Sequence, residues 1–167
     1  MQTETEFLRQ TAERFRETFD HVLKAVGQLD DEQVWKRPSM ESNSAGIVLQ
    51  HLIGNLNQWM CAGIGGETYK RNRPAEFRDD HHPSSETILR SFQELGNQIQ
   101  NILGAVPPES LHTPKTIQNM DGTVMSAIYK AITHCEFHAG QLLYIAKLML
   151  NEKYKGVWGP PPANSQG

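Results

Sequence analysis

The chain has 167 residues, of which 38% are hydrophobic, and a formal net charge of −3. This length allows one domain with a full core, without disulfides or structural metals to hold it together. Acidic and basic residues are interspersed and no polybasic block occurs, so the chain lacks the positive surface typical of nucleic-acid-binding proteins and we expect no such partner.

The N-terminal stretch MQTETEFLRQ lacks the basic start and apolar run of a signal peptide. No uncharged apolar run reaches the ~20 residues of a membrane span, so we expect no membrane partner. The two cysteines, Cys61 and Cys135, lack CxxC spacing, which argues against a disulfide framework or a thiolate zinc site. These features predict a cytoplasmic protein in a reducing compartment.

The first predicted helix covers residues 8–29, where apolar side chains recur every three or four positions. The second covers residues 48–59 and is shorter, with apolar and polar residues sharing one face. It follows Asn43-Ser44, whose side chains suit an N-cap. Both segments are therefore predicted to pack one face against other helices.

A long polar connection, residues 63–83, separates the second helix from the third. It exceeds the ~12–15 residues usual for structureless loops. We expect it to cross over the bundle or to fold over one end as a lid, with Phe77 as its aromatic anchor. Arg71 and Arg73 in this segment are candidates to hold an anionic substrate group, and ordinary solvated charges are the alternative.

The third and fourth predicted helices cover residues 88–106 and 124–149. Ser84-Ser85 and Asp121-Gly122-Thr123 offer N-cap side chains at their starts. A short hairpin-like segment is expected just before the fourth helix, around Asp121-Gly122. The periodic pattern therefore resumes only after this irregular segment.

Four amphipathic helices of this kind pack most simply as an all-α four-helix bundle, here with a long connection between the second and third helices. The predicted domain covers residues 1–155. Residues 156–167 form a Pro-rich C-terminal tail that cannot continue a helix. Trp158 is expected to dock this tail on the domain.

Three histidines lie within or beside the apolar stripes. His134 and His138 are four residues apart, so they project from one face of a helix with Cβ atoms ~6 Å apart, close enough to share a metal ion. His51 lies among the apolar residues of the second helix. Burying neutral imidazoles without partners costs roughly a few kcal/mol each, so three inward histidines require a common reason. One divalent cation provides it, and we predict His51, His134 and His138 as metal ligands.

Structural alternatives apply to each candidate. A buried histidine is commonly satisfied by protein atoms, although three such cases on two helices would have to coincide. Asn55 lies one turn after His51, where its amide would orient a water or substrate or bond to backbone. Trp59 is either a core residue or a substrate platform near the cavity mouth. Glu136 is expected at the surface and Cys135 as a small apolar core residue. The remaining histidines are expected at the surface or in loops: His21, His81, His82 and His112.

The segments NSAGIVLQHLIGNLNQW and HCEFHAGQLLYIAKL resemble those of DinB-like (YfiT-like) proteins, a family regarded as metal-dependent enzymes. The resemblance implies a four-helix bundle in which one histidine of the second helix and an HxxxH pair of the last helix bind a divalent metal. These positions match His51, His134 and His138. The glutamine of HAGQ and the tryptophan of NLNQW also fit the family's usual context.

The resemblance further implies thiol-dependent chemistry, such as transfer of a low-molecular-weight thiol like bacillithiol onto an electrophile, or mycothiol-dependent isomerisation. Three imidazoles leave a divalent cation (Zn, Ni or Fe) with an open coordination position, as in catalytic sites. We therefore expect an S-transferase or a hydrolase acting on a small molecule, with no catalytic residue identified. The alternative is a non-catalytic, stress-associated protein that binds a metal or small ligand. The resemblance also implies a homodimer.

Overall fold

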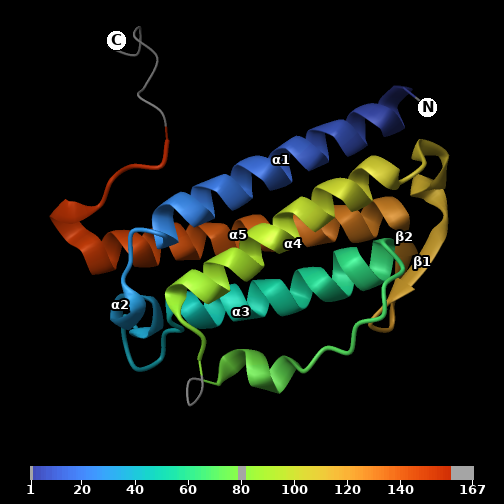
Figure 1. The fold of residues 1–167 in the computed structure, drawn as a ribbon. Coiled ribbons are helices and arrows are strands. Elements are labelled where there is room, and N and C mark those ends of the chain that lie inside the picture. The colour runs from blue at the N-terminus through green and yellow to red at the C-terminus, as the bar shows by residue number, and fades with distance from the viewer. Residues whose placement is uncertain (1, 79–81, 159–167) are drawn as a thin grey trace, which may run out of the picture.

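The computed structural model describes residues 2–78 and 82–158. Its four long helices are α1 (Gln2–Val26), α3 (Ala45–Leu56), α4 (Ser85–Ala105) and α5 (Val124–Leu150), and they lie side by side as a bundle (Figure 1). Helices α1 and α3 each contact α4 and α5, so they occupy diagonal corners. The predicted all-α four-helix bundle is confirmed.

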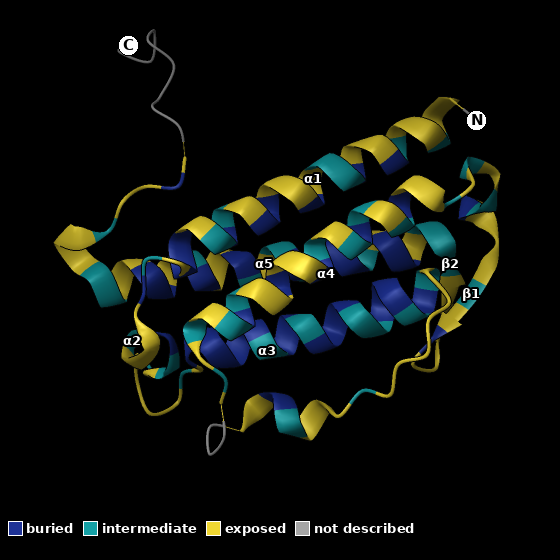
Figure 2. Cartoon of the chain, in the orientation of Figure 1, coloured by how far each residue is buried: buried dark blue, intermediate teal, exposed yellow. Residues whose placement is uncertain are grey.

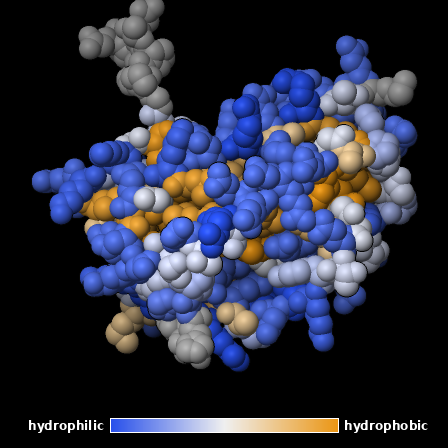
Figure 3. Space-filling view, in the orientation of Figure 1, coloured by the Kyte–Doolittle hydropathy of each residue, from blue (hydrophilic) through white to orange (hydrophobic). Residues whose placement is uncertain are grey.

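The core is built from the apolar faces of these helices. Figure 2 shows buried positions on the sides that face one another, and α3 is buried along most of its length. Between α1 and α4, Phe19 and Phe92 stack with ring centroids 4.1 Å apart. Hydrophilic side chains cover most of the face drawn in Figure 3, with an apolar band across its middle. Within the described residues, no helix has the length and apolar character needed to cross a membrane.

The helix starts follow from local sequence. Ser44, Ser84 and Thr123 are the N-caps of α3, α4 and α5, and each side chain accepts a hydrogen bond from a backbone N–H three residues later. Thr123 and Ser126 form a reciprocal capping box. Each cap satisfies a backbone donor that the helix itself leaves unpaired. The predicted capping positions are confirmed.

A short helix, α2 (Asp31–Trp35), was not predicted because five residues are too few to show a period. Asp30 and Gln33 close it with a capping box. Trp35 then packs on α3 at Gly46, where an added Cβ would lie 2.4 Å from the indole ring. On its other side, the Trp35 ring stacks on His82 with centroids 4.4 Å apart.

Helix α3 continues directly into the π-helix η1 (Asn57–Ile64), which extends the second predicted helix past Trp59. The remaining elements are short: η2 (Arg73–Phe77), η3 (Pro108–His112), β1 (Pro114–Ile117), β2 (Met120–Thr123) and η4 (Asn151–Lys153).

Strands β1 and β2 form the expected antiparallel hairpin, with Pro114 opposite Thr123. The turn, however, lies at Gln118 and Asn119, whose φ angles are 53° and 61°, and not at Asp121-Gly122, which lies inside β2. A two-residue hairpin turn requires positive φ at both central residues, and asparagine tolerates this conformation. The Asp-Gly signal therefore predicted the hairpin but misplaced its turn.

The long connection lies along the outer side of α3 and does not cap an end of the bundle (Figure 1). Its buried anchor is Glu76, which is 7% exposed, and Phe77 is 37% exposed. The expectation that Phe77 anchors the segment is therefore wrong, because a buried ion pair takes that position. His81 lies outside the described residues.

The Trp158 ring lies 4.0 Å from the ring of His21 on α1, measured between centroids, as expected for a residue that docks the tail. Residues 159–167 of the predicted tail lie outside the described residues. The domain boundary at residue 155 stays a prediction.

Candidate metal site

Three imidazoles converge between α3 and α5. His51 comes from α3, and His134 and His138 come from successive turns of α5. One nitrogen from each ring can be chosen so that all three lie within 4.8 Å of one another. The Nε2 atoms of His51 and His134 are 3.4 Å apart, and two nitrogens bound at ~2.0–2.1 Å to a tetrahedral cation lie about 3.4 Å apart. The three histidines could therefore hold one metal ion.

The outer nitrogens of two of these rings have partners that set their orientation. His51 Nδ1 lies 3.0 Å from Glu76 Oε2, and His138 Nδ1 lies 2.7 Å from Gln141 Oε1. Carboxylate and amide oxygens accept hydrogen bonds, so each Nδ1–H donates and leaves the lone pair on Nε2, toward the cluster. Metal-binding histidines are commonly oriented in this way.

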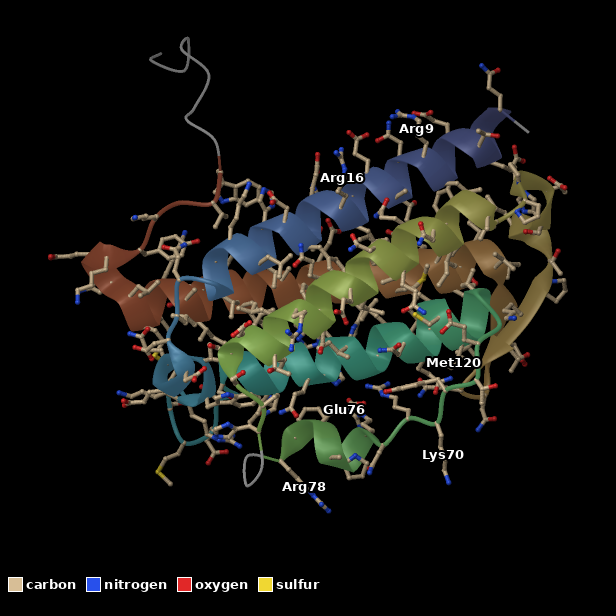
Figure 4. All side chains as sticks on the ribbon, viewed as in Figure 1. Arg9, Arg16, Lys70, Glu76, Arg78 and Met120 are labelled. Carbon is tan, nitrogen blue, oxygen red and sulfur yellow. The ribbon has the colours of Figure 1, made fainter. Side chains whose placement is uncertain are left out.

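Glu76 is part of a buried ion pair supplied by the long connection. Arg71 Nε lies 2.6 Å from Glu76 Oε1 and Arg71 Nη2 lies 2.7 Å from Oε2, and the two side chains are only 7% and 8% exposed. Glu76 lies on the side of η2 that faces α3, whereas Arg78 extends away from the bundle (Figure 4). This bidentate pairing fixes the carboxylate that accepts from His51.

The approach of Glu76 to α3 depends on Gly54. An added Cβ at Gly54 would lie 2.2 Å from Glu76 Oε1, so any other residue would displace the carboxylate. Sequence reasoning missed Glu76, because a single carboxylate in a polar loop has no periodic signal. Only the path of the loop brings it to His51.

Burial favours the neutral form of all three imidazoles. Burial lowers the pKa of His51, although hydrogen bonding to Glu76 opposes this shift. Burial also lowers the pKa of His138. The pKa of His134 falls to about 4, first because of burial and then because a protonated His134 would be repelled by His138 and His51 in their protonated forms, by Arg71 and by Lys130. Neutral imidazole is the form that binds metal.

The cluster is open to one side. His51 is buried, but His134 and His138 are half-buried. These two are therefore more exposed than their positions within or beside the apolar stripe of α5 predict. Two aromatic rings lie beside the imidazoles: Phe77 is 5.2 Å from His51 and Phe137 is 5.3 Å from His138, between ring centroids. The rings of His134 and His138 are therefore partly accessible to solvent, with apolar rings beside the cluster.

The two further candidates follow His51 in the chain, Asn55 on α3 and Trp59 on η1. Asn55 is 8% exposed, and its Oδ1 is buried without a hydrogen-bond partner among the described residues, so it is not a backbone-bonded amide. Trp59 is a core residue, 5% exposed, whose Nε1 donates to Gln118 Oε1 at 3.2 Å. Lys130 Nζ lies 4.6 Å from the centre of the Trp59 ring.

The remaining predictions concern two arginines of the long connection and two further residues of α5. Arg71 is not available to a substrate, because Glu76 occupies it. Arg73 lies over the Phe77 ring at 5.5 Å. Cys135 is a fully buried apolar packing residue, as predicted. Glu136, expected at the surface, is half-buried and pairs with Arg14 of α1.

Comparison with known proteins agrees with this architecture. A model of the family described as "Protein of unknown function (DUF1572)" matches residues 2–161. No curated protein matches the chain.

Similar solved structures include two DinB-like proteins. That from Bacillus cereus ATCC 10987 is 18% identical with a TM-score of 0.67, and the match covers 92% of this chain and 95% of that one. That from Bacillus subtilis is 14% identical with a TM-score of 0.67, covering 90% and 99%. A conserved protein from Enterococcus faecalis is 17% identical with a TM-score of 0.60, covering 89% and 96%. At these identities the likeness shows a shared fold. The resemblance to DinB-like proteins is therefore confirmed at the level of the fold.

Proposed function

Because the chain belongs to the DUF1572 family and has the fold of DinB-like proteins, we propose that it is a divalent-metal-dependent enzyme with His51, His134 and His138 as ligands. The main support for this proposal is the convergence of three imidazoles from two helices. A set of three neutral ligands without thiolate or carboxylate is typical of catalytic sites with an open position. Zinc, nickel and iron all suit imidazole ligands.

The chain's own residues prepare the site. Glu76 and Gln141 accept hydrogen bonds from Nδ1 of His51 and His138. The Nε2 lone pairs of both rings are therefore directed toward the histidine cluster. Phe77 and Phe137 place apolar surface beside the open side and limit its hydration. A bound divalent cation supplies Lewis-acid chemistry, which lowers the pKa of a thiol or water toward neutrality.

The reaction class follows from the resemblance to DinB-like proteins. A small thiol loses its S–H proton and its sulfur forms a bond to an electrophilic carbon, whose leaving group departs and accepts the proton. Hydrolysis is the corresponding reaction with water as nucleophile. Both cysteines of the chain are buried, at 1% and 0% exposure, so a reacting thiol must enter as a small molecule.

Metal content tests the ligand assignment. We expect about one divalent ion per chain in protein purified without nickel resin, measured by elemental analysis. His51→Ala and His138→Ala should lose this ion and keep the helical circular dichroism signal. His112→Ala is the matched control, because that side chain is 68% exposed in a distant element. Unchanged metal content in the two ligand variants would reject the assignment.

Turnover separates an enzyme from a binding protein. The metal-loaded protein is screened with small thiols and electrophiles, and with hydrolysable esters and amides. Saturable turnover that disappears in His138→Ala supports the proposed function. Tight ligand binding without turnover would assign the protein to the non-catalytic alternative. Assembly as a homodimer stays a prediction.

A further inference from the structure

A cavity of about 360 Å³ lies in the groove between α3 and α5, next to the candidate metal site. Val48 lines it from α3, and Gln141 and Ile145 line it from α5. Gln141 also accepts the hydrogen bond from His138 Nδ1 at 2.7 Å. One side chain therefore borders both the cavity and the histidine cluster.

Helix geometry places this cavity and the histidines in one groove. Val48 precedes His51 by three residues on α3, and Gln141 follows His138 by three residues on α5, so each pair shares a helix face. The rings of His51 and His138 are 4.9 Å apart between centroids. The cavity therefore begins about one turn from the histidines, and Ile145 at its other end lies roughly 10 Å beyond His138 along the α5 axis. A substrate bound at the histidines can reach the cavity through a linker of a few atoms.

The lining of the cavity suits an apolar group. Val48 and Ile145 are buried and border it on the side of the core, whereas the exposed side chains of Tyr144 and Leu148 border it closer to solvent. Among the described residues that line it, only Glu41 is charged, and a carboxylate repels an anionic group. Pockets for small molecules are commonly of this size, with mostly apolar walls and a few polar groups. The cavity therefore favours an uncharged apolar group.

The loop that closes the cavity is ordered by its own hydrogen bonds. Ser42 and Asn43 line the cavity from this loop, between α2 and α3. Arg37 Nη1 donates to the Ser42 carbonyl at 3.0 Å, and the hydroxyl groups of Ser39 and Ser42 are 2.6 Å apart. The loop then ends at Ser44, the N-cap of α3. A preformed wall lowers the cost of ordering the protein around a ligand.

Two other cavities are less suited to extend the site. A larger one, about 530 Å³, lies beside the C-terminal end of α4 at Ile102 and Val106, and none of the described residues that line it belongs to the site. Another borders Glu76, but it opens between α3 and α4 at Ile53 and Ile88, whereas the histidines lie between α3 and α5. The cavity at Gln141 is therefore the one that continues the groove of the histidines.

We propose that this cavity binds an uncharged apolar group, such as a phenyl ring, on the small-molecule substrate whose reacting atom lies at the histidine cluster. This inference rests on the proposed function and narrows its substrate class. Gln141 lies between the two parts of the site, where it orients His138 and contacts the linker of the substrate.

Paired thiol probes test the cavity without requiring turnover. Cobalt-loaded protein is titrated with 1-propanethiol and 3-phenyl-1-propanethiol, which differ by the phenyl ring, and the dissociation constants are measured by absorbance and calorimetry. Because burial of a phenyl ring is favourable, we expect the phenyl thiol to bind about 10-fold or more tightly. The ratio of the two dissociation constants is the preference to be compared among variants.

Leu148→Asp places a charge on the wall of the cavity and should abolish the preference for the phenyl thiol. Tyr144→Ala removes another part of the same wall and should lower the preference as well. Both positions are exposed, and circular dichroism checks that each variant is folded. Tyr129→Asp is the matched control, because Tyr129 is also an exposed apolar residue of α5 but does not line this cavity. The control should keep the preference.

The outcomes separate the two proposals. Equal affinities in the wild-type protein, a preference that survives in both wall variants, or one that Tyr129→Asp also loses would overturn the role of the cavity and leave the metal-dependent function intact. Failure to retain cobalt, or failure of both thiols to bind, would overturn the proposed thiol chemistry and the role of the cavity with it. A preference that is lost in a wall variant and kept in Tyr129→Asp supports the proposal.

Discussion

Glu76 is the residue on which the orientation of His51 depends. Its carboxylate accepts from His51 Nδ1 and is itself held by Arg71 in a nearly solvent-free environment. Hydrogen-bond partners behind a metal-binding histidine set the tautomer and direction of the ring. A change at Glu76 should therefore act on the metal through His51.

Glu76→Gln keeps the size of the side chain and removes its charge. We expect metal affinity to fall by about 10–100-fold, because the amide leaves a single uncharged acceptor oxygen for which His51 and Arg71 compete. Competition with a chromophoric chelator measures the affinity. Glu136→Gln is the matched control, since Glu136 also pairs with an arginine, Arg14, and forms no ion pair with a histidine among the described residues. Wild-type affinity in Glu76→Gln would contradict the role given to this carboxylate.

The same substitution leaves Arg71 buried without its counter-ion. Breaking a buried pair from one side costs roughly 3–5 kcal/mol of unfolding free energy, whereas removing both charges costs much less. Chemical denaturation of Glu76→Gln and of Arg71→Met/Glu76→Gln should therefore show partial recovery in the double variant. A double variant that is less stable than the single one would contradict this account.

The two cysteines are predicted to be chemically inert in the folded protein. Burial raises the pKa of Cys61 to about 11 and raises that of Cys135 further. At pH 8 the thiolate fraction of Cys61 is then about 100-fold below that of a free cysteine. Ellman's reagent should react slowly with the native protein and rapidly with the same protein in guanidinium chloride. Fast labelling under native conditions would show that the buried positions are open to solvent.

At the scale of elements, the site depends on a close approach between η2 and α3. Gly54 permits this approach because the Glu76 carboxylate occupies the place where a Cβ would lie. The loop therefore lies against the helix where Glu76 approaches Gly54 and accepts a hydrogen bond from His51. We expect this loop to open without unfolding the bundle, because it lies on the outer side of α3.

Gly54→Ala should detach this loop without removing α3. The added methyl group displaces Glu76, so we expect trypsin to cleave faster after Lys70 and Arg71 and metal affinity to fall, while the helical signal stays. Gly140→Ala is the matched control, because no atom lies within 4 Å of its added Cβ. Alanine in that exposed helical position should stabilise the protein by up to about 1 kcal/mol. Equal cleavage rates in the two variants would contradict the prediction.

At the scale of the whole molecule, the bundle is held by one continuous apolar core. Phe92 is fully buried and stacks on Phe19 across the α1–α4 interface. Phe92→Ala should lower the free energy of unfolding by about 3–5 kcal/mol, because a large cavity remains. Urea denaturation followed by circular dichroism measures it. Tyr144→Ala, at a position 64% exposed, should change stability by no more than about 0.5 kcal/mol.

Much of the fold could be predicted because its signals are local. The apolar spacing of α1, α4 and α5 and the caps at Ser44, Ser84 and Thr123 depend on residues three or four positions apart. Elements with weak local signals were missed or misplaced. Helix α2 is too short to show a period, and the hairpin turn uses Gln118-Asn119 rather than the stronger Asp-Gly signal.

For the site, the sequence by itself determined which three histidines lie on or beside the apolar face of a helix. Spacing along a helix sets the direction in which each side chain projects. Only the tertiary structure decided that Glu76 accepts from His51 while paired with Arg71, and that Lys130 lies over the Trp59 ring. Those contacts join residues from different elements, and their formation depends on how a loop and two helices pack. Spacing along the chain carries no information about such packing, which is decided by the shape of the assembled core.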